Sequence, residues 1–296
     1  MRTFALALFV QTLLARGIPH CAAGERFWTA ENVLLGGQTL DDILQRAPFG
    51  GNDDFSLHEV TYNGSLATFK YITTKFDEHF ARARNEVEML TRVTRVPRAS
   101  HILACVTGTD YVGIFLTAQG VDLRTHLFSM AQPPQMITRL ELLHKAAQAV
   151  ADLHAVGIAH GDLRLENFRF KPTPSKSLFL ANFEHATGLV ELRSEAQGRE
   201  VTVVPRSPQE SRAKDARDFA VMALILLNPE FAEKFYAPPQ EGQAPTTPRL
   251  EELLDAAKKS SDPTTRKAVV GCIGGSTLSF AQIVAEIEGL VKGLIL

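Results

Sequence analysis

The spacing of apolar residues changes along the chain, and this change limits the folds that the chain can adopt. Residues 55–73 read FSLHEVTYNGSLATFKYIT, in which apolar and polar residues alternate on either side of an Asn-Gly pair. This pattern predicts two antiparallel strands joined by a tight turn. Residues 77–93 have a helical period, and HILACVTG and YVGIFLTA then predict two further strands. The first part of the chain is therefore expected to form a small sheet with one helix.

The second half of the chain is predicted to be mostly helical. The segment LELLHKAAQAVADLHAVG predicts an amphipathic helix that ends at Gly157. DARDFAVMALILL is apolar almost all round, which predicts a helix buried inside a lobe. A last helix over SFAQIVAEIEGLVKGLI has an apolar stripe formed by Ile283, Ile287, Leu290 and Leu294. The predicted fold class is α+β, with a small antiparallel-sheet lobe followed by a larger helical lobe.

The N-terminal residues have the order of a secretory signal peptide. Arg2 precedes an apolar run, and small residues follow up to Ala23. We expect cleavage after Ala23, which assigns residues 1–23 to the leader and predicts a secreted protein; the alternative is a buried N-terminal helix. No later apolar run approaches the ~20 residues that a membrane helix needs, so we expect no transmembrane segment.

Charge and cysteine usage exclude two classes of function. The formal net charge of -2 gives no electrostatic reason to expect binding to nucleic acid. Cys105 and Cys272 each lie in an apolar segment without a His or a second Cys at metal-ligand spacing. We therefore expect buried free thiols rather than a metal site.

The strongest motif is GIAHGDLRLENFRF, in which His160, Asp162 and Asn167 follow one another at fixed spacing. This string resembles the catalytic loop of the protein kinase superfamily, and the resemblance extends over nearly all of the mature chain. It implies that Asp162 accepts the proton of an attacking hydroxyl and that Asn167 holds a metal ion bridging the phosphates. The alternative is that Asp162 and Asn167 only organise a tight loop.

The resemblance also implies partners elsewhere in the chain. Lys70 in LATFK would bind the nucleotide phosphates and pair with Glu86 in ARNEVEML. The small lobe, with an N-terminal extension, would cover residues 24–118, and the large lobe residues 119–296. Other residues at family positions are expected to support the frame: Leu90, His160 and Phe183 in a hydrophobic spine, Asp218 as anchor of the catalytic loop, and Pro208, Gln209 and Glu210 at the end of the activation segment.

Two departures from the family concern metal binding and activation. Asn182 stands where the family has the Asp that binds magnesium, and a neutral amide lacks the charge that a hard divalent ion prefers. Glu184 offers a carboxylate two residues later, so the metal site formed by Asn167, Asn182 and Glu184 is expected to be degenerate. Gly161 replaces the family's Arg, which removes the partner of a phosphorylated activation loop.

Two further departures concern the nucleotide. Residues 48–55 read PFGGNDDF where a glycine-rich phosphate flap belongs, and Asp53 and Asp54 would repel a triphosphate. Arg169 lies between Phe168 and Phe170, so its side chain is expected on the opposite face of the strand, where the family holds adenine. Arg169 would stack on the base or block it, and blocking is favoured because an unpaired buried charge is costly.

One branch of the kinase-like proteins combines three features of this chain: a leader, a His-Gly-Asp loop followed by Asn-Phe, and a missing glycine flap. The chain is in these respects similar to the rhoptry and dense-granule kinase-like proteins secreted by coccidian parasites, of the bradyzoite pseudokinase type that lacks the glycine loop. This resemblance implies a secretory organelle, the parasitophorous vacuole or the host cell as the location. It implies a host or vacuolar protein as the partner.

Three functions stay open at this point. The first is a secreted pseudokinase that acts as a protein-binding or regulatory module. The second is an active, divergent Ser/Thr protein kinase that uses Asp162 as base, Asn167 and Glu184 for the metal, and Lys70 with Glu86 for the phosphates. The third is a small-molecule phosphotransferase, because such enzymes also use a His-Gly-Asp loop followed by Asn. ATP and magnesium are expected as cofactors only if nucleotide binding is retained.

Overall fold

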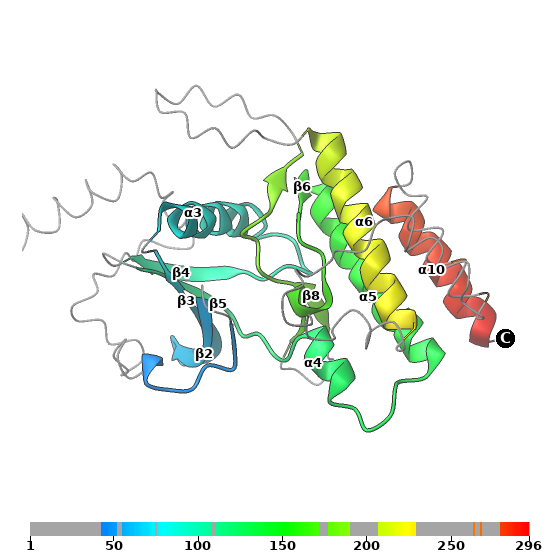
Figure 1. Cartoon of the computed structure of the whole chain (residues 1–296), viewed down its shortest axis with the longest axis horizontal. Helices are drawn as coiled ribbons and strands as arrows, with labels where there is room; N and C mark the ends of the chain where they lie inside the picture. Colours follow the sequence, from blue (N-terminus) through cyan, green and yellow to red (C-terminus); the bar gives the residue numbers. More distant parts are fainter. Residues whose placement is uncertain are drawn as a thin grey trace, which may run out of the picture. The chain divides into compact units, whose positions relative to one another are not determined.

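The structure is a computed structural model of the chain, and the described chain forms two compact units (Figure 1). It describes residues 43–51, 55–74, 76–107, 111–171, 177–189, 207–228, 263, 267 and 279–295. The first unit contains the described residues up to Gly120 together with Asn182–Ala186. The second unit contains Val121–Ala181 and the described residues from Thr187 onward. The predicted signal peptide lies outside the described residues.

The first unit is built on a five-stranded antiparallel sheet with the strand order β1-β2-β3-β5-β4. The strands are β1 (Gly50–Gly51), β2 (Phe55–Tyr62), β3 (Ser65–Thr73), β4 (Ile102–Thr107) and β5 (Tyr111–Thr117). Asn63 and Gly64 join β2 to β3 with φ angles of 50° and 77°. Two positive φ values are what a two-residue hairpin turn requires, so the hairpin predicted from the Asn-Gly pair is confirmed.

Helix α3 (Asp77–Arg92) covers one face of this sheet and contacts β3, β4 and β5. Its buried side chains recur at helical spacing, as at Ala83, Val87 and Leu90. Glu86 lies on the same buried face and is 1% exposed. The helix therefore places the Glu86 carboxylate on the sheet side, away from solvent.

An aromatic cluster covers the other face of the sheet. Phe69 and Phe115 are fully buried with ring centroids 4.7 Å apart, and Ile43 packs into the same cluster with no exposed surface. Ile43 precedes β1 in the chain, so a residue from outside the sheet contributes to this cluster. Because both faces are covered, β5 is buried at five consecutive positions, Val112–Leu116.

The second unit is mainly helical and contains α4 (Leu123–Phe128), α5 (Met136–Ala155), α6 (Pro208–Leu227) and α10 (Phe280–Ile295). Helix α5 packs against both α6 and α10 (Figure 1). Two short antiparallel sheets and a 3-10 turn carry the loops: β6 (Ile158–Ala159) with β9 (Thr187–Gly188), β7 (Phe168–Phe170) with β8 (Leu178–Leu180), and η1 (Leu165–Asn167).

The ends of these helices follow their local sequence. Gly157 has φ 74° just after α5, as expected for a glycine that ends a helix. Ser207 caps α6, and Glu210 completes a capping box there, so this carboxylate stabilises the start of the helix. On α10, Ile283 and Ile287 are buried but Leu294 is 48% exposed, so the predicted stripe leaves the core before its last residue.

The α+β prediction is confirmed, and the architecture is a two-lobed, protein kinase-like fold. No helix among the described residues is long and apolar enough to cross a membrane. The free-thiol prediction is wrong for Cys105, which is disulfide-bonded.

Gly113 on β5 is a site where one added methyl group is expected to destabilise the first unit. A Cβ at this position would lie 2.5 Å from the Phe69 ring and 2.6 Å from Val106. Replacing Gly113 by Ala should therefore lower the free energy of unfolding by about 1–3 kcal/mol, the usual cost of overpacking a core. Urea denaturation of the purified chain measures this change.

The matched control is Gly289→Ala on α10, where nothing lies within 4 Å of the added Cβ. Alanine in a helix interior is favoured over glycine by ~0.5–1 kcal/mol, so this variant should be slightly stabilised. Equal unfolding energies for the two variants would contradict the close packing around Gly113.

Candidate functional site

In the first unit, the ammonium group of Lys70 is surrounded by three groups of the chain itself. Lys70 Nζ donates to Glu86 Oε2 at 2.7 Å and to Asn182 Oδ1 at 2.6 Å. The ring of Phe55 lies 4.2 Å from the same nitrogen. An ammonium has three N–H donors, and here two are directed to oxygens while the aromatic face supplies a cation–π contact.

The Lys70–Glu86 pair is almost completely buried, with side chains 3% and 1% exposed. Moving two charges out of water is costly, and the pair compensates for this only because the two groups are in direct contact. The structure thus brings together the two residues that the resemblance assigned to phosphate binding. Their catalytic role stays a prediction.

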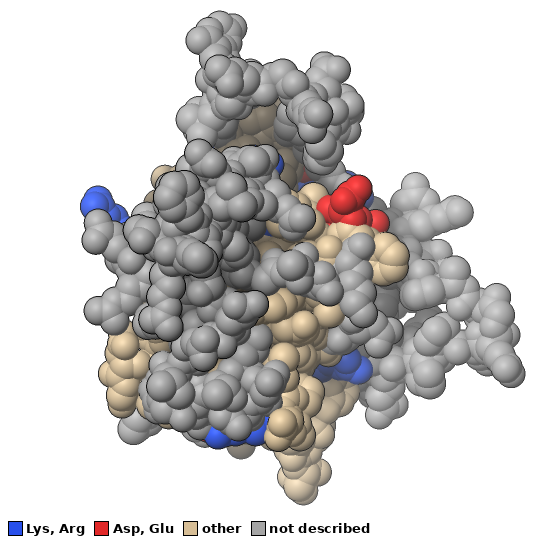
Figure 2. Space-filling view, turned by 90° about the vertical axis from the view of Figure 1, so that its left-hand side faces the viewer, with Lys and Arg blue, Asp and Glu red and all other residues tan. Residues whose placement is uncertain are grey.

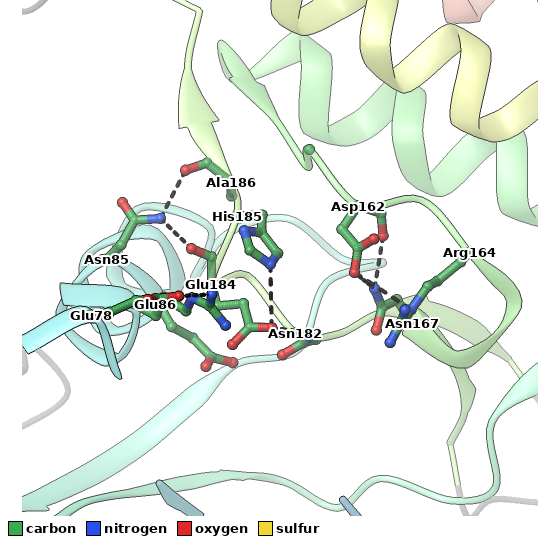
Figure 3. Close-up of polar contacts among 12 residues, drawn as sticks. Glu78, Asn85, Glu86, Asp162, Arg164, Asn167, Asn182, Glu184, His185 and Ala186 are labelled. Carbon is green, nitrogen blue, oxygen red and sulfur yellow. Dashed lines mark hydrogen bonds and ion pairs between the residues drawn. The ribbon is translucent and has the colours of Figure 1, made fainter. Parts of the chain in front are cut away.

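Asn182 has φ 65°, in the left-handed region that Asn tolerates better than most residues. Its Oδ1 accepts from Lys70, and its Nδ2 donates to Glu184 Oε1 at 3.4 Å (Figure 3). An Asp at this position could not make the second contact, because a carboxylate has no N–H. The neutral amide therefore connects a cation to an anion.

Glu184 is also close to His185, with Glu184 Oε1 and His185 Nε2 separated by 3.6 Å. The carboxylate that the sequence offered as a replacement metal ligand is thus engaged within its own segment. Among the described residues, no group of three or more His, Cys, Asp or Glu side chains is arranged to hold a metal ion.

Asn85 is a residue of this site that the sequence interpretation missed. Its Nδ2 donates to the backbone oxygens of Glu184 at 2.9 Å and Ala186 at 3.0 Å (Figure 3). The segment Asn182–Ala186 is therefore attached to α3 through its main chain. No motif reveals such a contact, because the two acceptors lie 99 and 101 residues further along the chain.

In the region of the expected glycine flap, β1 pairs antiparallel with the start of β2. Gly50 and Gly51 pair with Leu57 and Ser56. Gly51 has φ 128°, and a Cβ there would lie 2.3 Å from the carbonyl oxygen of Phe55. This strand pair leads directly into Phe55, whose ring covers Lys70. Asp53 and Asp54 lie outside the described residues.

In the second unit, the predicted catalytic loop is held by its own side chains. Asn167 Nδ2 donates to Asp162 Oδ2 at 2.8 Å and to the Asp162 backbone oxygen at 2.7 Å (Figure 3). Arg164 Nε lies 3.5 Å from the same carboxylate, whose side chain is 26% exposed. These contacts organise the loop, a catalytic role of Asp162 stays a prediction, and Arg164 is a neighbour that the sequence interpretation did not consider.

The residue that anchors this loop is Asp215, and the prediction of Asp218 is wrong. Asp215 is fully buried, and its carboxylate accepts from the backbone nitrogens of His160 at 2.8 Å and Gly161 at 2.7 Å. His154 Nε2 on α5 lies 2.8 Å from Asp215 Oδ2. The sequence shows two Asp residues on one helix, and only the packing of α6 selects between them.

Asp218 is bonded instead to Lys214 on its own helix. Burial raises the pKa of the Asp218 carboxyl, and the Lys214 ammonium opposes this shift. Lys214 also donates to the backbone oxygen of Gly161. Lys214 therefore brings a positive charge to the backbone of the loop at Gly161.

Arg169 lies in the middle of β7 opposite Phe179 and is 9% exposed. Burial lowers the pKa of its guanidinium, and the charge of Asp122 opposes this effect. Asp122 and Arg169 also form a strand bridge. That Arg169 stacks on a base or blocks it stays a prediction, and the negative charge of Asp122 lies close enough to act on its guanidinium.

Comparison with known proteins supports a relation to kinases over the middle of the chain. The model of the lipopolysaccharide kinase (Kdo/WaaP) family matches residues 80–219. A "Kinase and exchange factor for Rac A" of Dictyostelium discoideum is 24% identical over 137 residues, which is 46% of this chain. The match covers 10% of the length of that protein. Together with the fold, these similarities show that the chain is a kinase-like protein.

Proposed function

We propose that this kinase-like protein does not transfer phosphate and acts as a protein-binding or regulatory module. The observation that carries the proposal is the enclosure of the Lys70 ammonium. Lys70 Nζ lies 2.7 Å from Glu86 Oε2, 2.6 Å from Asn182 Oδ1 and 4.2 Å from the centre of the Phe55 ring. A phosphate would have to displace Asn182 or the ring before it could contact this cation.

The residues available for a metal ion support the same proposal. Magnesium is bound through carboxylates and phosphates because it loses water reluctantly. Asn182 contributes no charge, and its oxygen already accepts from Lys70. Glu184 is bonded to Asn182 and lies close to His185. These groups fit a divalent ion poorly, so no catalytic step is assigned to one.

A second candidate is an active, divergent kinase that uses Asp162 as base with ATP and magnesium. The contact of Asp162 with Asn167 at 2.8 Å and the Lys70–Glu86 pair favour it. The name of the matching family, lipopolysaccharide kinase, describes an acceptor that is not a protein, so the small-molecule phosphotransferase also stays open as a variant of this candidate. Both depend on nucleotide binding, so one test separates them from the first proposal.

The location and the partner belong to the proposal as well. A secreted protein of the coccidian rhoptry or dense-granule type, with a host or vacuolar protein as partner, agrees with the predicted leader. The disulfide at Cys105 supports an oxidising compartment, where disulfides persist. On the face drawn in Figure 2, the charged side chains of the described residues are few and scattered among uncharged ones.

Thermal melting of the purified chain with ATP and ADP, each with magnesium, manganese or chelator, tests the proposal. We expect no change in the melting temperature under any of these conditions. A ligand at a hundred times its Kd would stabilise the chain by about 2.7 kcal/mol, enough for a shift of several degrees. A metal-dependent shift that is absent in Asp162→Ala or accompanied by phosphate transfer would favour the active kinase.

A further inference from the structure

Asn85 occupies a position from which it can control the Lys70 ammonium without touching it. It precedes Glu86 on α3, and its Nδ2 donates to two backbone oxygens, at 2.9 and 3.0 Å, on either side of His185. These contacts do not depend on the side chains of the bound segment. They use the N–H donors of one amide to hold two residues of main chain.

The contact made by Asn85 closes a ring of three connections within the first unit. Lys70 joins β3 to α3 through Glu86, Asn85 joins α3 to the segment Asn182–Ala186, and Asn182 joins that segment back to Lys70. Phe183, inside the segment, has no exposed surface. Each connection limits the freedom of the other two, because all three elements must move together.

The buried carboxylate of Glu86 keeps the Lys70 ammonium in place. Glu86 Oε1 is buried and has no hydrogen-bond partner in the described part of the chain. Removing the ammonium would leave this carboxylate buried without compensation, which is costly. The Lys70 ammonium therefore stays beside Glu86 when the segment Asn182–Ala186 is released. Only the N–H that Lys70 donates to Asn182 then becomes accessible.

We propose that Asn85 is a positioning residue that keeps Asn182 Oδ1 on the Lys70 ammonium, so that the chain's own amide excludes phosphate. The inference rests on the proposed function and names what regulates that same site. Release of the segment from Asn85 exposes one N–H of Lys70 to a phosphate oxygen. A nucleotide then binds through its phosphates without a divalent ion.

Asn85→Ala and Asn85→Asp test this proposal in the full chain, and Arg84→Ala, at an exposed position of the same helix, is the control. The first readout is hydrogen exchange at Ala186, whose N–H donates to the Phe183 oxygen at 3.1 Å. We expect exchange about tenfold faster or more in both Asn85 variants, which corresponds to ~1.4 kcal/mol. Arg84→Ala should exchange at the wild-type rate.

The second readout is the affinity for ATP in the presence of chelator, measured by calorimetry. Both Asn85 variants should bind ATP at least about tenfold more tightly than the wild type, a gain that a loss of rigidity alone does not produce. Unchanged hydrogen exchange at Ala186 in the Asn85 variants would show that Asn85 does not hold the segment, and would overturn the proposal. Faster exchange without tighter ATP binding would leave Asn85 a structural residue only. If the wild type itself transfers phosphate, the proposed function fails, and this result is independent of the Asn85 comparison.

Discussion

Replacing Asp215 by Ala is expected to lower the free energy of unfolding by about 3–5 kcal/mol, since each buried donor that loses its acceptor costs about 1–3 kcal/mol. The substitution removes the acceptor for the backbone nitrogens of His160 and Gly161 and the partner of His154. These groups lie at the start of the loop and at the end of α5. Urea denaturation followed by circular dichroism measures the loss.

Asp218→Ala is the control for Asp215→Ala, because both residues lie on α6 and differ in their partners. Asp218 is bonded to Lys214, and burial raises the pKa of its carboxyl, so its ionised form contributes less to stability. We expect a loss clearly smaller than that for Asp215. An equal or larger loss would show that Asp218 holds the loop after all.

Lys70→Met is the second substitution with a large expected effect. Methionine keeps much of the side-chain volume and removes the charge, which leaves Glu86 as a buried, uncompensated carboxylate. Breaking a buried ion pair in this way costs about 3–5 kcal/mol. In a chain of this size, we expect a melting temperature lower by roughly 6–20 °C, at about 2–4 °C for each kcal/mol.

The double variant Lys70→Met with Glu86→Gln distinguishes charge from packing. If the uncompensated charge causes the loss, neutralising Glu86 should recover a large part of it, and the two single effects should not add. Additive losses would mean that Lys70 stabilises the unit mainly through its packing, for example against the Phe55 ring. The same melting experiment provides all three values.

The parts of the fold that local sequence determines could be predicted well. The hairpin β2–β3 follows from period-two alternation around Asn63 and Gly64, and both residues adopt the positive φ that this turn needs. The end of α5 follows from Gly157 for a similar reason. In these places each residue's preference agrees with the final structure, so no distant information is required.

The details of the site depend on contacts between distant segments, and these could not be predicted. Two Asp residues stand three positions apart on α6, and no rule of spacing says that Asp215 faces the loop. Asn85 binds carbonyl oxygens, which every residue has. The strand bridge between Arg169 and Asp122 was missed for the same reason, because Asp122 lies 47 positions earlier in the printed sequence.

The closed ring of Lys70, Asn85 and Asn182 has a consequence for how a cell could use this protein. A molecular switch needs two states separated by only a few kcal/mol, so that a ligand can shift the balance between them. The ring described above holds the first unit in one of two such states, with Asn182 Oδ1 on the Lys70 ammonium. A ligand that binds the segment Asn182–Ala186 better when it is released from Asn85 would therefore shift the protein towards the other state.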